Sequence, residues 1–301
     1  MLDKDHYDQA ATVFSPDGRV YQVEYAREAI RRGGLALGIT FDNGILFAID
    51  KSIYSPLIEE DDLEKFYKIT PVIGAAASGL IADARVLVDI LRDRAQSEKR
   101  RYGEDPDLRT LVTWVSRIYE VYTRYEGVRP FGTALIIGGR AGKRYRLFET
   151  DPSGVFQERS STAIGRGSET ALEILTANNG KVRTREDAIT LSMNVLKSTR
   201  QESAEGSNLG MELHILTDGN FEKIDLTEEQ VAEHVSGNEG DGSLEGLLCG
   251  VPRLTKEAKN NLLATYGDLS SLKKASIRDL MKVKGVGNAT AERIRKALEE
   301  L

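Results

Sequence analysis

The sequence predicts an α+β fold, in which antiparallel sheets are covered by layers of helices and a small all-helical domain follows. Apolar runs of strand length come in hairpin groups and do not alternate singly with helices, which is the pattern of antiparallel sheets. Amphipathic segments of helical period come in pairs. A polar, glycine-rich segment near residue 240 then separates a C-terminal part of different composition.

The first expected elements surround a turn and a hairpin. Pro16 and Gly18 indicate a tight turn, because proline fixes φ and glycine accepts positive φ. A helix is expected at about residues 19–32, and Gly33-Gly34 is expected to end it with a left-handed residue. Strands follow at residues 35–41 and 44–50, joined by an Asp-Asn-Gly hairpin signal, and a strand of small residues at 72–79.

Two long helices are expected next, at about residues 80–101 and 107–125, each with one apolar face. Further strands are expected at residues 133–139, 144–150, 154–158, 161–165 and 211–217. Shorter helices are expected at residues 168–177 and 184–198, with a last one near residues 227–235.

The charge divides the 301 residues into two parts. Residues 243–301 hold 11 Lys and Arg against 7 Asp and Glu, whereas residues 1–242 hold 30 against 40. Such asymmetry predicts two modules with different partners. The segment at residues 236–243, "SGNEGDGS", contains no apolar residue and is therefore expected to be a flexible linker. The predicted domains are residues 1–235 and 244–301.

The composition excludes several classes of protein. No apolar run approaches the ~20 residues of a membrane span, so we expect no membrane partner. The only cysteine, Cys249, forms no internal disulfide, and with no signal peptide at the start we expect a reducing, cytoplasmic setting. Three scattered histidines and one cysteine make a metal site unexpected. The sequence likewise indicates no cofactor.

Several longer motifs point to a known family. "FSPDGRVYQVEYAREA", residues 14–29, closely resembles the N-terminal signature of proteasome α subunits. Four further motifs are similar to the same family in its order and spacing: "YD" at 7–8, "SGLIADARVLVD" at 78–89, "GVRPFG" at 127–132 and "ETDPSG" at 149–154. The resemblance covers about residues 7–235. It implies a four-layer α-β-β-α sandwich of the N-terminal nucleophile hydrolase type, and an archaeal-like subunit in the outer seven-membered ring of the 20S core.

The same resemblance implies a subunit without catalytic activity. In the related β subunits an N-terminal threonine is both nucleophile and base, which requires a free α-amine beside the hydroxyl. Here Gly34 stands at the corresponding strand start and is preceded by a whole expected helix. Peptide hydrolysis would then come from partner β subunits.

The resemblance also implies roles for three groups of residues. A gate over the axial pore would use Tyr7, Asp8, Pro16 and Tyr25. Lys65 matches a lysine that pairs with the C-terminal carboxylate of a regulatory ATPase tail, in a pocket walled by Glu24, Gly33, Gly79 and Leu80. A loop beside the pore would consist of Glu126, Gly127, Val128 and Arg129.

Simpler interpretations of these residues remain open. The gate segment has Gln9 where the family usually has arginine, and the alternative is a disordered terminus with a common turn. Lys65 is alternatively a solvated lysine at a strand edge. Glu126 replaces a usual glycine, and it would either face the pore or point outward into solvent.

The C-terminal part resembles a second family. "VKGVGNATAERI", residues 283–294, is similar to the helix-hairpin-helix motif, in which backbone amides at a helix start hold a nucleic-acid phosphate. The implied contacts are Gly285, Gly287, Lys282, Lys284, Arg293 and Arg295, with Asn288 expected to cap the next helix. Residues 251–263 look like an earlier copy, with Arg253 and Thr255 where the glycines belong.

The function of this tail is left open between DNA or RNA binding, protein docking and a structural appendage. The leading interpretation of the whole chain is a non-catalytic proteasome α subunit that forms rings, gates the pore and docks an ATPase. The alternatives are an oligomeric scaffold tethered to nucleic acid, and an autonomous hydrolase, for which the sequence offers no catalytic constellation.

Overall fold

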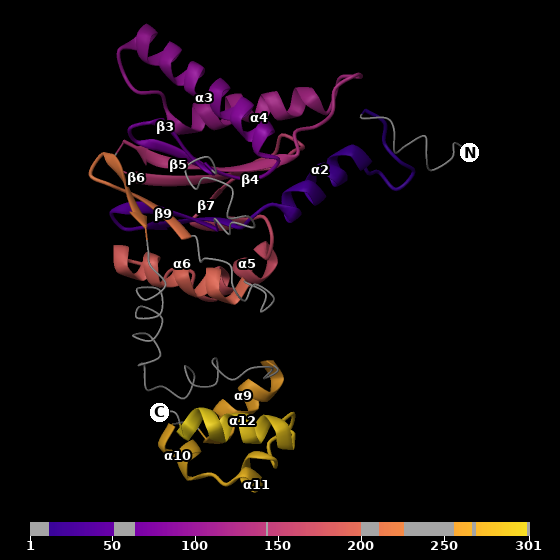
Figure 1. The fold of residues 1–301 in the computed structure, drawn as a ribbon, viewed down its shortest axis with the longest axis vertical. Coiled ribbons are helices and arrows are strands. Elements are labelled where there is room, and N and C mark those ends of the chain that lie inside the picture. The colour runs from indigo at the N-terminus through magenta and orange to yellow at the C-terminus, as the bar shows by residue number, and fades with distance from the viewer. Residues whose placement is uncertain are drawn as a thin grey trace, which may run out of the picture. The chain divides into compact units, whose positions relative to one another are not determined.

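The computed structural model describes residues 12–50, 64–142, 144–199, 211–225, 256–266 and 269–299. The chain divides into two compact units, Met1–Val231 and Ala232–Leu301. The first unit stacks two five-stranded antiparallel sheets between two layers of helices (Figure 1). The α-β-β-α sandwich expected from the sequence is therefore confirmed.

One sheet has the strand order β10-β9-β2-β1-β8. Its strands are β1 (Ala36–Phe41), β2 (Gly44–Asp50), β8 (Ser161–Ile164), β9 (Met211–Thr217) and β10 (Asn220–Asp225). The predicted hairpin joins β1 to β2 through a two-residue loop, in the register Phe41 opposite Gly44. Helices α5 (Ser168–Ala177) and α6 (Arg185–Thr199) cover its outer face (Figure 1).

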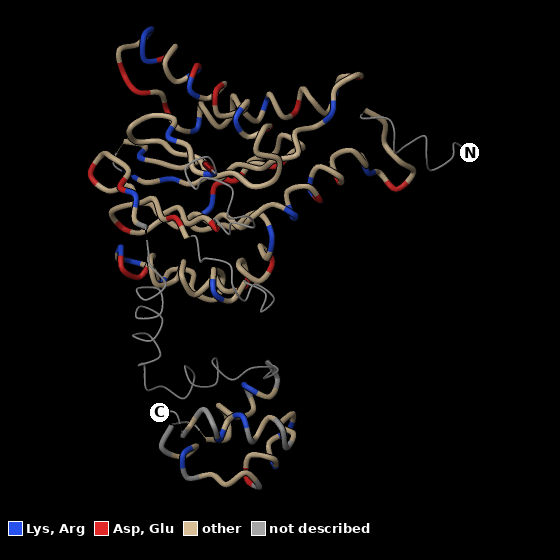
Figure 2. The backbone as a smooth tube through the Cα atoms, in the orientation of Figure 1, with Lys and Arg blue, Asp and Glu red and all other residues tan. Residues whose placement is uncertain are grey.

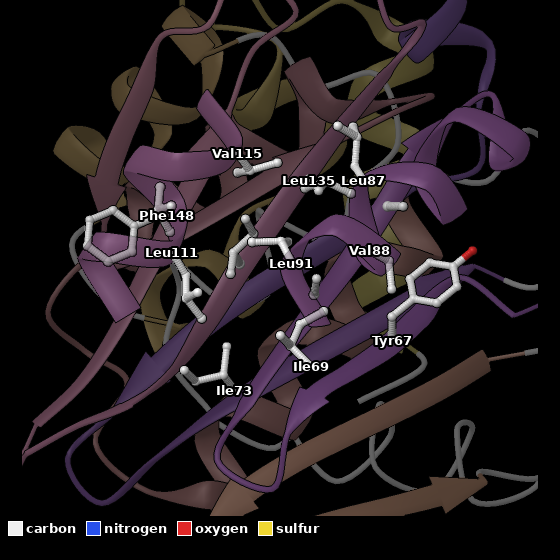
Figure 3. Close-up of a cluster of buried hydrophobic side chains, with 14 of the residues drawn as sticks. Tyr67, Ile69, Ile73, Leu87, Val88, Leu91, Leu111, Val115, Leu135 and Phe148 are labelled. Atoms are coloured by element: carbon white, nitrogen blue, oxygen red, sulfur yellow. The ribbon is translucent and has the colours of Figure 1, made fainter. Parts of the chain in front are cut away.

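The second sheet has the order β3-β4-β5-β6-β7. Its strands are β3 (Phe66–Thr70), β4 (Ile73–Gly79), β5 (Thr133–Ala141), β6 (Arg144–Thr150) and β7 (Phe156–Arg159). Helices α3 (Ile81–Tyr102) and α4 (Leu108–Tyr122) lie on this sheet, as their apolar faces predict. Leu87, Leu91, Leu111 and Val115 meet Phe148 in the core beneath them (Figure 3).

Helix α2 (Tyr21–Arg32) lies at one end of the sandwich, against β4 and β5 (Figure 1). The apolar stripe expected from its sequence is buried at Val23, Ala26 and Ile30. The predicted turn before the helix is present and is closed by a hydrogen bond from the Gly18 amide to the Ser15 carbonyl at 2.8 Å.

The second unit is a small helical bundle with its own core. Its helices are α9 (Lys256–Tyr266), α10 (Leu269–Lys274), α11 (Ile277–Leu280) and α12 (Asn288–Glu299). Fully buried Leu262, Leu272, Leu280 and Ile294 fill the centre of this bundle. Lys and Arg outnumber Asp and Glu among its coloured residues (Figure 2), in agreement with the positive charge of the tail sequence.

Some expectations differ from the structure. Strands β3 and β10 were not predicted, because each has a lysine near its middle, which obscures the alternating pattern. Gly33 was expected to be left-handed, but its φ of −66° and ψ of 160° are extended. That prediction was wrong: Gly33 is needed for close packing, as described below. The expected helix near residues 227–235 and the linker at 236–243 lie outside the described residues.

Within the described ranges, no helix combines the length and apolarity that crossing a bilayer requires. The same ranges contain no group of three His, Cys, Asp or Glu side chains placed to hold a metal ion.

Candidate functional site

A junction of glycines around Ser78 attaches the end of α2 to both sheets. A Cβ atom on Gly33 would lie 2.4 Å from the Gly79 nitrogen and 2.5 Å from Ser78 Oγ. Ser78 is buried, and its hydroxyl donates to the Gly34 carbonyl at 2.9 Å. The Arg166 amide donates to the Gly33 carbonyl at 2.8 Å. These bonds provide donors for the carbonyls of the two residues that directly follow α2.

Lys65 lies beside this junction, just before β3. Its ammonium group donates to the Asp50 carbonyl at the end of β2, at 2.9 Å. A Cβ atom on Gly34 would lie 2.5 Å from Lys65 Nζ, so the lysine end group occupies the space that a side chain at position 34 would need. The structure therefore brings Lys65, Gly33 and Gly79 into one neighbourhood.

The other two predicted pocket residues differ in their placement. Leu80 follows Gly79 directly and is 45% exposed at the start of α3. Its amide donates to the Gly132 carbonyl at 2.9 Å. Glu24 lies nine residues before Gly33 on α2, about 13 Å along the helix axis. It accepts a hydrogen bond from Arg27 at 2.8 Å. Within one chain, Glu24 is thus separate from the Lys65 neighbourhood.

Of the four predicted gate residues, the structure describes Pro16 and Tyr25. Pro16 is exposed in the turn before α2, and Tyr25 is 50% exposed on the helix, stacked on Tyr21 with ring centroids 6.5 Å apart. Tyr7 and Asp8 lie outside the described residues, as does Gln9.

The predicted pore loop is held at one end by an ion pair. Glu126, Gly127 and Val128 are exposed, and Gly127 has a φ of +84°, which favours glycine. Arg129 instead turns back and donates twice to Asp83 of α3, at 2.6 and 2.8 Å. Asp83 also accepts from the Gly132 amide at 2.8 Å. These hydrogen bonds, foremost those from Arg129, lower the pKa of the Asp83 carboxyl below its ordinary value.

A second ion pair fastens α2 to the loop between β6 and β7. Arg27 donates to both carboxylate oxygens of Asp151, at 2.9 and 3.0 Å. Burial by itself raises the pKa of Asp151, but the hydrogen bonds from Arg27 and Ser153 outweigh it and lower that pKa overall.

The predicted hairpin of the second unit lies between α11 and α12. Gly285 has a φ of +92°, and a Cβ atom on it would lie 3.2 Å from Ala258 Cβ on α9. Apart from the two chain neighbours of Gly287, no residue has an atom within 4 Å of where its Cβ would be. Asn288 was expected to cap α12, but it is the first helical residue, so Gly287 occupies the cap position. The Gly287 carbonyl accepts from the Thr290 and Ala291 amides.

Lys282 and Arg295, two of the predicted cations, make hydrogen bonds within the unit. Lys282 donates to Asp279 at 2.7 Å, and this bond, together with those from Ser276, lowers the pKa of the Asp279 carboxyl to about 2. Arg295 donates to the Lys273 carbonyl at 3.2 Å and the Ala275 carbonyl at 3.4 Å. Lys284 is exposed beside the hairpin, and Arg293 is half-buried on α12.

Comparison with protein families matches three parts of the chain. The general profile of proteasome subunits matches residues 30–216, and the profile of the N-terminal signature of A-type proteasome subunits matches residues 7–29. The chain belongs to the proteasome subunit family. The profile of the SAM-like helix-hairpin-helix tandem matches residues 245–300, so the predicted tail domain is confirmed as well.

Individual relatives place the chain in the alpha class of the proteasome family. The proteasome alpha subunit of Methanopyrus kandleri is 45% identical over 236 residues, 78% of this chain and 95% of the relative. That of Methanosarcina thermophila is 43% identical over 235 residues, 78% and 94% of the two chains. That of Methanocaldococcus jannaschii is 41% identical over 228 residues, 76% and 87%. The resemblance to archaeal proteasome α subunits is therefore confirmed.

Sequence reasoning missed the residues that position this proteasome site. Asp83, Asp151 and Ser78 lie inside motifs that resemble the family, but their partners are 46, 124 and 44 residues away in sequence. A motif can single out such a residue, but it does not indicate the hydrogen-bond partner, which comes close only when the sheets form. Asn261, which reaches the hairpin from α9, carries no signal in the sequence pattern.

Proposed function

We propose that this chain is a non-catalytic α subunit of a 20S proteasome core, in the outer seven-membered ring, with β subunits and further α subunits as partners. The observation that carries the proposal is the family match over residues 7–216, with Gly34 following α2 where a catalytic subunit needs a free N-terminal threonine. A single cysteine suits a reducing, cytoplasmic setting.

Two measurements test this proposal. Size-exclusion chromatography of the purified chain should show rings. Peptidase activity should appear only after addition of archaeal proteasome β subunits. A Gly34→Thr variant should stay inactive by itself, because its amine remains in a peptide bond behind α2. Peptidase activity of the chain alone would favour the autonomous hydrolase instead.

We propose that a regulatory ATPase docks at Lys65. The support is its position: a long-stemmed cation beside Gly33, Gly79 and the exposed Leu80 suits the C-terminal carboxylate of a partner tail. Because Glu24 lies apart within one chain, the proposal needs it from a neighbouring protomer. Lys65→Ala should abolish binding of a peptide with a free C-terminal carboxylate, whereas Lys68→Ala on β3 should not. Equal loss in both variants would contradict a specific pocket.

The gate and pore loop are proposed on the same resemblance. Tyr7, Asp8, Pro16 and Tyr25 would hold the gate, and Glu126–Arg129 would border the pore. Glu126 is exposed and Arg129 anchors the loop, which supports a ring of seven carboxylates facing the passage. Glu126→Gly should change the uptake of unfolded protein relative to short peptides. Unchanged uptake would favour an outward-facing carboxylate.

We propose that the helix-hairpin-helix tail binds DNA or RNA through backbone phosphates. The family match, the positive charge of residues 243–301 and the exposed Lys284 support it. Labelled duplex should bind the full chain more weakly at 200 mM than at 50 mM salt, with a slope of about −0.9 per phosphate contact in log K against log salt. A chain ending at Ser236 should not bind. Absence of binding in both would favour protein docking or a structural appendage.

A further inference from the structure

The hairpin at residues 283–287 is supported from one side by helix α9 of the preceding motif. Asn261 donates its side-chain N–H to the Lys284 carbonyl at 2.9 Å, across 23 residues of sequence. Gly285 packs so closely on α9 that its Cβ would lie 3.2 Å from Ala258 Cβ. Ala258 is fully buried, so this side of the hairpin is closed to any partner.

The bond from Asn261 also orients a backbone amide. A trans peptide is planar, with its C=O and N–H pointing in opposite directions. Because the Lys284 carbonyl points to Asn261, the N–H of Gly285 in the same peptide points away from α9. The Asn261 bond therefore sets the direction of an amide on the opposite side of the hairpin.

That opposite side is open at the second glycine. Apart from its two chain neighbours, no residue has an atom within 4 Å of where a Gly287 Cβ would be, and the φ of Gly287 does not lie in the left-handed region. It precedes α12, a helix of 12 residues. Both hairpin glycines are exposed, but a Cβ on Gly285 would point at α9, whereas a Cβ on Gly287 would point into open space.

We propose that α9 serves as the support for the second hairpin, with Asn261 as its positioning residue, and that a nucleic-acid backbone approaches from the Gly287 side alone. This inference rests on the nucleic-acid binding proposed above. The first, degenerate motif then positions the second hairpin and makes no phosphate contact of its own. This accounts for Arg253 and Thr255 at the positions where its glycines would stand.

The test measures binding of the full chain to a labelled duplex of about 20 base pairs, as affinity and as salt slope. Asn261→Ala should weaken binding about fivefold, since it removes a hydrogen bond of ordinary strength, and should reduce the slope. Asn261→Gln, which keeps the donor, should restore part of both. Thr265→Ala, one turn further along α9, is the matched control and should bind like the natural chain.

Gly287→Ala tests the open side, because no steric clash is expected in the folded tail. It should weaken duplex binding while the tail keeps its helical circular dichroism. If Asn261→Ala unfolds the tail, Gly287→Ala decides: binding equal to the natural chain overturns the inference. Unchanged affinity and slope in a folded Asn261→Ala variant also overturn it. Absence of binding by the natural chain contradicts the proposed nucleic-acid function itself.

Discussion

At the scale of single residues, Asp83 joins helix α3 to the loop after α4. Its side chain is 11% exposed and accepts three hydrogen bonds, two from Arg129 and one from the Gly132 amide. A carboxylate in this position is stabilised in its charged form, which is why its pKa is lowered. The geometry of the loop at Glu126–Val128 therefore depends on a residue outside it.

The lowered pKa of Asp83 predicts a dependence of stability on pH. A carboxyl with a lower pKa in the folded state contributes stability above its unfolded pKa of about 3.9, and this is lost as pH falls through the folded value. The free energy of unfolding of Asp83→Asn should differ most from that of the natural chain above pH ~5 and least near pH ~2. Denaturant titrations across that range measure it. A difference independent of pH would contradict the prediction.

Ser78 provides a second prediction at this scale. Ser78→Ala removes a buried hydroxyl and leaves the partly buried Gly34 carbonyl without its donor, so it should lower the free energy of unfolding by about 1–3 kcal/mol. The matched control is Ser198→Ala, whose hydroxyl bonds an exposed helical carbonyl at 2.8 Å and should change stability by less than about 0.5 kcal/mol. Equal losses of unfolding free energy in the two variants would contradict a stabilising role for the Ser78 hydrogen bond.

At the scale of elements, helix α2 is fixed at both its C-terminus and its middle, by different means. The glycine junction holds its C-terminus, and the bidentate pair between Arg27 and Asp151 holds its middle. Its first turn has no side-chain cap at Val20. The N-terminal turn of α2 is therefore expected to open first.

Arg27→Ala should loosen α2 without unfolding the sheets. Since both partners are about a third exposed, the loss is expected to be about 1 kcal/mol. Hydrogen exchange should accelerate at the α2 amides and stay unchanged in β4 and β5. The control is Arg31→Ala, whose contact with Glu28 is at 4.0 Å and exposed. Protection of α2 equal in both variants would contradict the role of the pair.

At the scale of the whole molecule, each unit has its own hydrophobic core. Among the described residues, the first unit has buried clusters on either side of one sheet, and the second buries Leu262, Leu272, Leu280 and Ile294. A chain ending at Ser236 should therefore retain the melting temperature of the first unit, measured by calorimetry. A clearly lower melting temperature in the shortened chain would show that the tail stabilises the sandwich.

Much of the fold could be predicted from sequence because its elements are local patterns. The apolar faces of α3 and α4 are buried as the helical period predicts, and the β1–β2 hairpin follows from a turn signal three residues long. The missed strands β3 and β10 carry Lys68 and Lys223 near their middles, so only pairing with β4 and β9 identifies them. Tyr7 and Asp8 stay predictions, since they lie outside the described residues.

The sequence by itself determined most of the elements and the family, because period, turn residues and long motifs are readable along the chain. Only the tertiary structure decided what each glycine and charge does. Gly33 is needed because a Cβ atom there would lie 2.4 Å from the Gly79 nitrogen, and Gly285 is needed because its φ is +92°, whereas a Cβ atom on Gly287 would meet open space. Arg129 pairs with Asp83, and Lys65 reaches Asp50, because folding brings together residues 46 and 15 positions apart. Such partnerships depend on distances in space, which no local pattern contains.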